Sequence, residues 1–363
     1  MFWVLAIAAC GFVAWVVPIR DRCIDPDAAA TAAVPVRVPV SREQTACTLH
    51  RPSGPATLDP AACARLSCEP GLYSTLSGAR LGVLALILVL YLAGSAAWAW
   101  RWRTLLTLAR VNISIAAVWR ITLEGQAAGI LLPGGVGGDA FRISALVGKG
   151  APTATVVASV VLDRAIGLAT LVVLATVLGI GFDHATVGPA ALTMAAIPVA
   201  LVGGLVVLRL PALARLPILN RGWLARTAKP VLDYLGDPAA PRAILRGFAV
   251  SLLVSGAQLL VIRGEIYALG IEPSHERWVY IGTAMAFVAT ALPALPGSWG
   301  TAEAAFVFLL APAGVPAPTA VAVCLLYRLF WYTSGAIGAA LLMLRGGATA
   351  KETPAPETPA PKA

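Results

Sequence analysis

The sequence predicts an all-α, polytopic integral membrane protein with about six spanning helices and two re-entrant broken helices in inverted repeats. Three observations predict this fold class. Hydrophobic residues make up 58% of the 363 residues and charged residues only 12%. The mean hydropathy is +0.81. Apolar runs long enough to cross a bilayer recur along the chain, with basic residues between them. This composition excludes an ordinary water-soluble enzyme.

The first apolar run ends at Pro18 and predicts an uncleaved transmembrane helix over residues 1–18. A signal peptide is the alternative, because residues 7–10 resemble a lipoprotein cleavage box. However, no basic segment precedes the run, and too few residues come before Cys10 for a normal signal core. We therefore favour the spanning helix.

Residues 19–78 are predicted to form a polar, electrically neutral loop that carries four of the six cysteines. An even number of cysteines in a segment poor in apolar residues indicates two disulfides and an extracytoplasmic location. Free thiols in a cytoplasmic loop are the alternative. The sequence does not choose between the possible pairings of the candidates Cys23, Cys47, Cys63 and Cys68.

An internal repeat follows. Residues 132–139 and 295–303 each contain Pro-Gly-x-x-Gly followed by a carboxylate, and each is preceded by an apolar run. An arginine inside a long apolar segment follows each motif at a similar distance: Arg164 in one case and Arg328 in the other. The repeat predicts two halves, at about 81–180 and 247–344.

The distribution of basic residues predicts how these halves are oriented. If every apolar run crossed the membrane, the basic segment 209–246 would lie outside, against the positive-inside bias. If 115–149 and 278–315 instead enter from opposite faces and return, that segment lies inside. The prediction is therefore an inverted repeat with cytoplasmic termini, its halves joined by a helix over 190–208 and by segment 209–246.

Segment 209–246 either lies on the membrane surface as an amphipathic stretch or is an ordinary cytoplasmic loop. The Pro-rich tail 346–363 is predicted to be disordered.

Charged residues within apolar segments are functional candidates, since each costs about 3 kcal/mol to insert. Asp139 and Arg142 share a helix face and can pair. Asp163 and Arg164 point about 100° apart and need separate partners. We expect the arginines at 164 and 328 to face a cavity as anion receptors, although purely structural ion pairs are the alternative. The candidates are Glu124, Asp139, Arg142, Asp163, Arg164, Glu303 and Arg328.

The glycine-rich motif has two interpretations. Successive backbone amides at a helix start bind phosphate groups well, which makes a lipid head group a natural ligand. Small residues also allow two membrane helices to pack closely. The residues concerned are Gly134, Gly135, Gly137 and Gly138.

Other features indicate that the chain is not an enzyme. We find no serine-hydrolase or P-loop motif, and Val136 stands where an intramembrane aspartyl protease has glycine. The three histidines lie near segment ends, so no zinc site or other cofactor is expected.

The net charge of +9 suits anionic lipid rather than nucleic acid. We interpret Trp98, Trp100 and Trp102 as an interfacial belt, and expect Arg263 and Glu265 to reach the outer interface.

Taken in order, these motifs resemble the lysylphosphatidylglycerol synthase transmembrane region, a family of flippase-like membrane proteins. The resemblance covers about residues 80–345. It rests on residues 124–126, 132–142, 163–168, 296–303 and 327–328.

The resemblance implies a flippase-like domain over 79–345 in the bacterial cytoplasmic (inner) membrane, with a membrane lipid as substrate. In the best-known members this region moves an aminoacylated phospholipid between leaflets, while a soluble domain, not found in this sequence, makes that lipid. A lipid-modifying enzyme is a possible partner. The implied substrate-binding residues are Glu124, Gln126, Pro133, Gly134, Gly135, Gly137, Gly138, Asp139, Arg142, Asp163, Arg164, Pro296, Gly297, Gly300, Glu303, Tyr327 and Arg328.

Two other functions stay open at this point. An ion-coupled carrier of a small anion would use the same glycines and arginines. A non-transporting accessory subunit could present lipid to a lipid-modifying enzyme or a glycosyltransferase.

Overall fold

A computed structural model describes Gly11 and residues 17–25, 37–42, 47–51, 54–66, 68–108, 110–131, 136–180, 231–290 and 298–351. Several predictions therefore lie outside the described residues. They concern nearly all of the first helix, the helix over 190–208, most of the basic segment and the Pro-rich end of the tail. The same holds for Cys10, Pro133, Gly134, Gly135, Pro296 and Gly297.

Within the described part of the chain, 4 helices are long and apolar enough to cross a membrane. They are α5 (Leu81–Leu108), α8 (Thr153–Gly179), α12 (Ala240–Ala268) and α15 (Ala317–Lys351). These helices lie where the sequence predicts four of its spans, and the other two predicted spans fall outside the described residues.

Two helix boundaries differ from the predictions. Helix α12 begins at Ala240 rather than near 247, because the Asp237 carboxylate accepts a hydrogen bond from the Ala239 amide (2.8 Å) and a proline occupies the first turn. Helix α15 continues past Arg345 to Lys351, so the first part of the predicted tail is helical.

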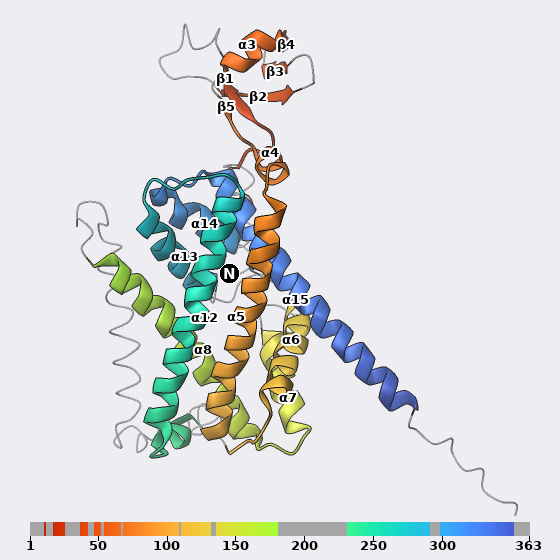
Figure 1. Cartoon of the computed structure of the whole chain (residues 1–363), viewed down its shortest axis with the longest axis vertical. Helices are drawn as coiled ribbons and strands as arrows, with labels where there is room; N and C mark the ends of the chain where they lie inside the picture. The colour runs from red at the N-terminus through yellow and green to blue at the C-terminus, as the bar shows by residue number, and fades with distance from the viewer. Residues whose placement is uncertain are drawn as a thin grey trace, which may run out of the picture.

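Each predicted broken helix is a pair of shorter helices. The first pair is α6 (Ile115–Leu131) and α7 (Val136–Val147), and the second is α13 (Glu276–Thr290) and α14 (Thr301–Leu310), followed by the 3-10 turn η4 (Ala311–Ala313). Figure 1 shows the first pair at the lower end of the bundle and the second at the upper end. The Pro-Gly motifs fall at the two breaks.

Glycines set how closely the helices approach. A Cβ on Gly138 of α7 would lie 2.8 Å from the Gly125 carbonyl oxygen of α6, and a Cβ on Gly338 of α15 only 2.0 Å from the Leu123 carbonyl oxygen. Small residues at such crossings let backbones pack directly against each other. For Gly138, the described structure therefore supports the close-packing interpretation.

The all-α prediction is wrong for the segment before α4 (Leu72–Ser77). This segment forms an antiparallel sheet in the order β4-β3-β2-β1-β5, with α3 (Pro60–Arg65) before the last strand. The strands are β1 (Arg22–Ile24), β2 (Arg37–Arg42), β3 (Cys47–Arg51), β4 (Gly54–Leu58) and β5 (Cys68–Glu69). We call residues 17–70 the disulfide unit.

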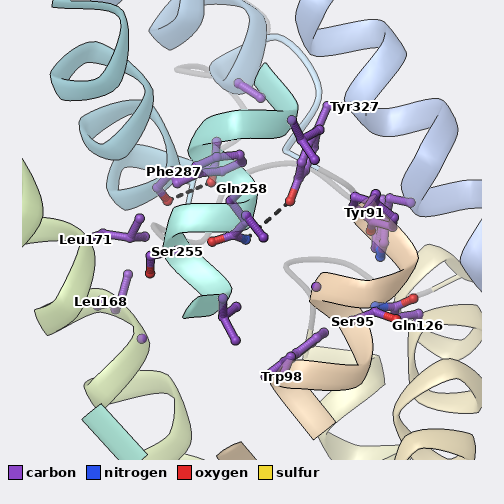
Figure 2. A pocket seen from close by; sticks show the side chains of 18 of the residues that line it. Tyr91, Ser95, Trp98, Gln126, Leu168, Leu171, Ser255, Gln258, Phe287 and Tyr327 are labelled. Atoms are coloured by element: carbon purple, nitrogen blue, oxygen red, sulfur yellow. Dashed lines mark hydrogen bonds between the residues drawn. The ribbon is translucent and has the colours of Figure 1, made fainter. Parts of the chain in front are cut away.

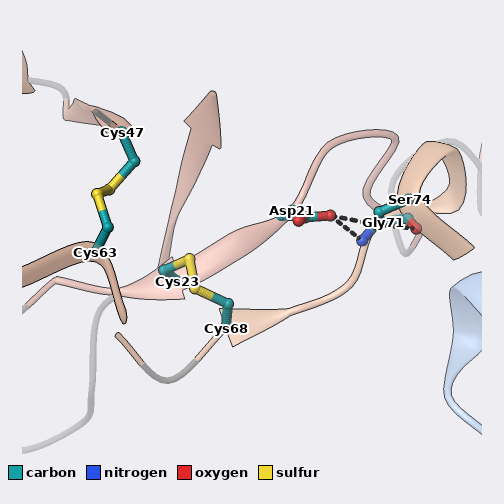
Figure 3. Close-up of a disulfide and its surroundings, with 7 residues drawn as sticks. All are labelled: Asp21, Cys23, Cys47, Cys63, Cys68, Gly71 and Ser74. Carbon is teal, nitrogen blue, oxygen red and sulfur yellow. Dashed lines mark hydrogen bonds between the residues drawn. A yellow bond between two sulfur atoms is a disulfide. The ribbon is translucent and has the colours of Figure 1, made fainter. Parts of the chain in front are cut away.

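The structure confirms two disulfides and determines their pairing, Cys23–Cys68 and Cys47–Cys63 (Figure 3). The segment also buries a small core, which includes Val38, Val40 and Leu49, contrary to our expectation that it was too poor in apolar residues. The pairing depends on strand register, because β1 places Cys23 directly opposite Cys68 on β5.

A short connection joins the disulfide unit to the helices. The Asp21 carboxylate accepts hydrogen bonds from the Gly71 amide (2.8 Å) and the Ser74 hydroxyl (2.5 Å), at the start of α4 (Figure 3). Helix α5 begins soon afterwards, so the unit lies at the upper end of the bundle (Figure 1).

Candidate functional site

A cavity of about 400 Å³ lies inside the bundle, with walls from α5, α6, α8, α12, α13, α14 and α15. Figure 2 shows Tyr91, Ser95 and Trp98 on one side and Leu168 and Leu171 on another. Polar and apolar side chains therefore share the walls. Other lining residues include Arg101, Gln126, Asp163, Arg164, Ser255, Gln258, Phe287, Thr290, Ser298, Tyr327, Arg328 and Trp331.

Asp163 of α8 is the centre of a hydrogen-bonded cluster at this cavity. Its side chain is fully buried. One carboxylate oxygen accepts from the Arg101 Nε (2.8 Å), and the other from the Trp98 Nε1 (2.9 Å) and an Arg142 guanidinium nitrogen (3.3 Å). Arg101 also donates to the Ser251 hydroxyl of α12 (2.9 Å). The cluster thus joins α5, α7, α8 and α12.

Asp139, in the first turn of α7, extends the cluster toward the cavity. It lies 3.4 Å from Arg142, as the three-residue spacing predicted, and it accepts a hydrogen bond from Arg164. Arg142 is buried with its guanidinium 3.9 Å from the centre of the Trp102 ring, a cation–π contact. Arg164 differs, since its side chain is 47% exposed and lines the cavity.

The second half of the chain contributes a smaller hydrogen-bonded cluster, centred on Glu303. Glu303, in the first turn of α14, accepts from Arg328 of α15 (2.5 Å) and from the Gly300 amide (2.7 Å). Gly300 has φ of +78°, a conformation that favours glycine. The Arg328 guanidinium lies 3.9 Å from the Trp299 ring centre. These contacts orient Arg328 where it lines the cavity.

The two halves therefore repeat one contact. In each, a carboxylate in the first turn of the helix after the break pairs with an arginine of the following long helix. Asp139 pairs with Arg164, and Glu303 with Arg328. The predicted separate partners for Asp163 and Arg164 are also present.

Other predicted site residues lie at or near the cavity. Gln126 lines it and accepts a hydrogen bond from Ser334. Tyr327 also lines it, and its hydroxyl accepts from the Gln258 amide (3.3 Å; Figure 2). Glu124 is buried and lies 3.7 Å from Arg120, away from the cavity lining.

The predictions for Trp98, Trp102 and Glu265 are wrong. Trp98 lies inside the site and Trp102 is fully buried, so neither belongs to an interfacial belt, and Arg101, which the sequence did not single out, lies inside the site with Trp98. The spacing of Trp98 and Arg101 could have indicated this position, because residues three apart share a helix face. Both side chains can therefore bind one carboxylate. Glu265 is fully buried rather than at the outer interface, because α5 and α15 cover its face of α12.

The two clusters can bind an anion. Together they hold four arginines, at 101, 142, 164 and 328, and three carboxylates, at 139, 163 and 303. The two clusters together thus carry one more positive than negative charge, and Arg101, Arg164 and Arg328 are the arginines among them that line the cavity. Arginine presents a planar set of donors that suits phosphate or carboxylate.

Comparison with known proteins agrees with the resemblance seen in the motifs. No curated protein sequence matches the chain. The model of the family described as the lysylphosphatidylglycerol synthase TM region matches residues 71–338. The matched region starts after the disulfide unit and contains every cavity residue named above, so the site belongs to the family part of the chain. The protein is therefore a member of the lysylphosphatidylglycerol synthase transmembrane-region family.

Proposed function

We propose that this protein moves a phospholipid, or another anionic or zwitterionic lipid, between the two leaflets of the membrane, without ATP of its own. One observation carries the proposal. A cavity inside the bundle is lined by carboxylate-paired arginines from both halves, Arg101 and Arg164 from the first and Arg328 from the second. Anion receptors from both halves at one cavity are what a substrate site between two repeats requires.

The cavity suits a lipid head group better than a whole lipid. A volume of about 400 Å³ is at the small end for ligand pockets. The arginines offer donors to a phosphate, while Leu168, Leu171 and Phe287 offer apolar contacts beside it (Figure 2). In this proposal the head group occupies the cavity and the acyl chains stay in the bilayer.

The proposed mechanism uses α6–α7 and α13–α14 as re-entrant hairpins that enter from opposite faces. Their positions at opposite ends of the bundle support this arrangement (Figure 1). A broken backbone at membrane depth is tolerated only where protein or a wet cavity surrounds it. Rocking of one half against the other would expose the head group to each side in turn.

Head-group accessibility in liposomes tests the proposal. The purified protein is reconstituted with a panel of labelled lipids, and the wild type is compared with Arg164→Ala and Arg328→Ala. Each arginine supplies charged hydrogen bonds of about 1.5–3 kcal/mol, so each variant should slow lipid movement by about 10- to 100-fold. Arg80→Ala is the matched control, because Arg80 lies over the Tyr267 ring and outside the cavity lining.

The outcomes separate the alternatives. If both variants fold and move lipid at the wild-type rate, the cavity is not the site. If folded wild-type protein moves no lipid of the panel, a small-anion carrier or an accessory role replaces this proposal.

A further inference from the structure

Glu265 of α12 is a buried carboxylate that the proposed lipid site does not use. Its side chain is fully buried, and neither carboxylate oxygen has a hydrogen-bond partner among the described residues. The carboxylates of Asp163 and Glu303 are also buried, but they accept two or more hydrogen bonds each. Glu265 therefore needs a different explanation.

The surroundings of Glu265 are apolar. Val261 and Ala268, one turn to either side on α12, belong to a core cluster with Ile87 of α5 and Phe330 of α15. Helices α5 and α12 are in direct contact here, since a Cβ on Gly264 would lie 2.8 Å from the Ile87 side chain. Glu265 has no solvent-exposed surface in the described structure.

No cation of the described structure compensates the carboxylate. The titratable groups close enough to interact with it are Tyr91 on α5 and Tyr327 and Cys324 on α15. All three are neutral side chains in their ordinary state. The charged groups of neighbouring elements have other partners: Arg263 binds Glu272 and Glu276, Arg328 binds Glu303, Arg164 binds Asp139, and Arg80 lies over Tyr267.

The protonation state follows from this environment. An ionised carboxylate without a partner is far more costly in an apolar interior than a neutral carboxylic acid. Glu265 therefore holds a proton in the arrangement described. It can release that proton only in an arrangement where water reaches it.

Glu265 is also one helical turn from a residue that lines the cavity. Val261, one helical turn before it, lines the cavity, as do Tyr91, Tyr327 and Cys324. A separation of α5 and α15 from α12 that opens the cavity at this point would also admit water to Glu265. Opening of the cavity and exchange of the proton would then occur together.

We propose that Glu265 is a proton-binding site that couples lipid movement through the cavity to proton movement across the membrane. The carboxylate takes up one proton when it is open to one aqueous side and releases it on the other, so the site returns to its starting state. This inference rests on the proposed function, and it adds the energy source.

Infrared spectroscopy tests the proton site without any lipid substrate. The wild-type spectrum at neutral pH should contain the carbonyl stretch of a protonated carboxylic acid that disappears in Glu265→Gln. Glu272→Gln, at a side chain that is 75% exposed, is the matched control and should keep the band. A wild-type spectrum without this band overturns the inference.

Lipid distribution under a pH gradient tests the coupling. In sealed liposomes with the membrane potential clamped at zero, a difference of one pH unit should drive about a tenfold lipid asymmetry if one proton accompanies one lipid. Glu265→Gln should still equilibrate lipid but reach a ratio of about one, while Glu272→Gln behaves as wild type. The thermal unfolding of each variant establishes that it is folded.

These readouts keep the two proposals apart. Lipid movement that ignores the gradient in the wild type overturns the coupling and leaves the lipid function intact. Accumulation that persists in folded Glu265→Gln also overturns it. Absence of lipid movement in all three proteins overturns the proposed function and the coupling with it.

Discussion

At the scale of single residues, the stability of the first half depends most on Asp163. It is fully buried and accepts from three donors, two of them arginines. Arg101 and Arg142 are themselves 7% and 2% exposed, so Asp163 compensates the charge of Arg101 and shares with Asp139 the compensation of Arg142. A buried charge that loses its counter-ion is strongly destabilising.

We therefore expect Asp163→Asn to lower the free energy of unfolding by about 3–5 kcal/mol. Asp139→Asn is the control, because Asp139 is partly exposed, its partner Arg164 is half exposed, and its buried partner Arg142 keeps Asp163 as a counter-ion. Asp139→Asn should lower the free energy of unfolding by less than Asp163→Asn does. Thermal unfolding in detergent measures both, and equal losses would show that burial does not determine the effect.

A second residue-scale prediction concerns the geometry of Arg164. Lysine keeps the positive charge but lacks the planar guanidinium that matches phosphate. Arg164→Lys should therefore fold normally and move lipid more slowly than the wild type, but faster than Arg164→Ala. Rates for the three proteins in the liposome assay check the order, and a wild-type rate for Arg164→Lys would mean that charge alone is recognised.

At the scale of elements, backbone contacts between helices determine the arrangement of the cavity walls. Helix α15, which carries Tyr327 and Arg328, packs on α6 at Gly335 and Gly338. Ser334 of α15 donates to Gln126 of α6 at the same crossing. This crossing holds α15, which forms a cavity wall in the second half, against α6, the first of the short helices.

Gly338→Ala should disrupt that crossing, since the added Cβ would lie 2.0 Å from a backbone oxygen that cannot move alone. Overpacking of this kind costs about 1–3 kcal/mol. Gly256→Ala in α12 is the matched control, because its Cβ would meet nothing within 4 Å. Thermal unfolding should separate the two, and an unchanged Gly338→Ala would contradict a backbone contact there.

At the scale of the whole molecule, the inverted topology is the main untested prediction. A reporter attached near residue 225 should be cytoplasmic, and one attached near residue 50 should be external. Accessibility to a membrane-impermeant label in intact cells measures both positions. An external signal at 225 would rule out re-entrant hairpins from opposite faces.

Much of this organisation could be predicted from local sequence. The four described spanning helices follow from the length and apolarity of their segments, and the breaks follow from Pro-Gly motifs. Asp139, Asp163, Arg164, Glu303 and Arg328 could be identified because a charge in an apolar segment is costly wherever it lies. Segment apolarity, Pro-Gly motifs and charges within apolar segments can each be recognised from residues that are close together in the sequence.

Only the tertiary structure decided the rest. The Cys23–Cys68 disulfide depends on β1 lying beside β5, and the role of Arg101 depends on Asp163, 62 positions away in the chain. The packing of Gly138 on Gly125 and the burial of Glu265 likewise depend on a neighbouring helix. Composition and periodicity report the cost of placing a side chain in lipid or water. They do not report which distant group meets it, because contacts between helices form only when the chain folds.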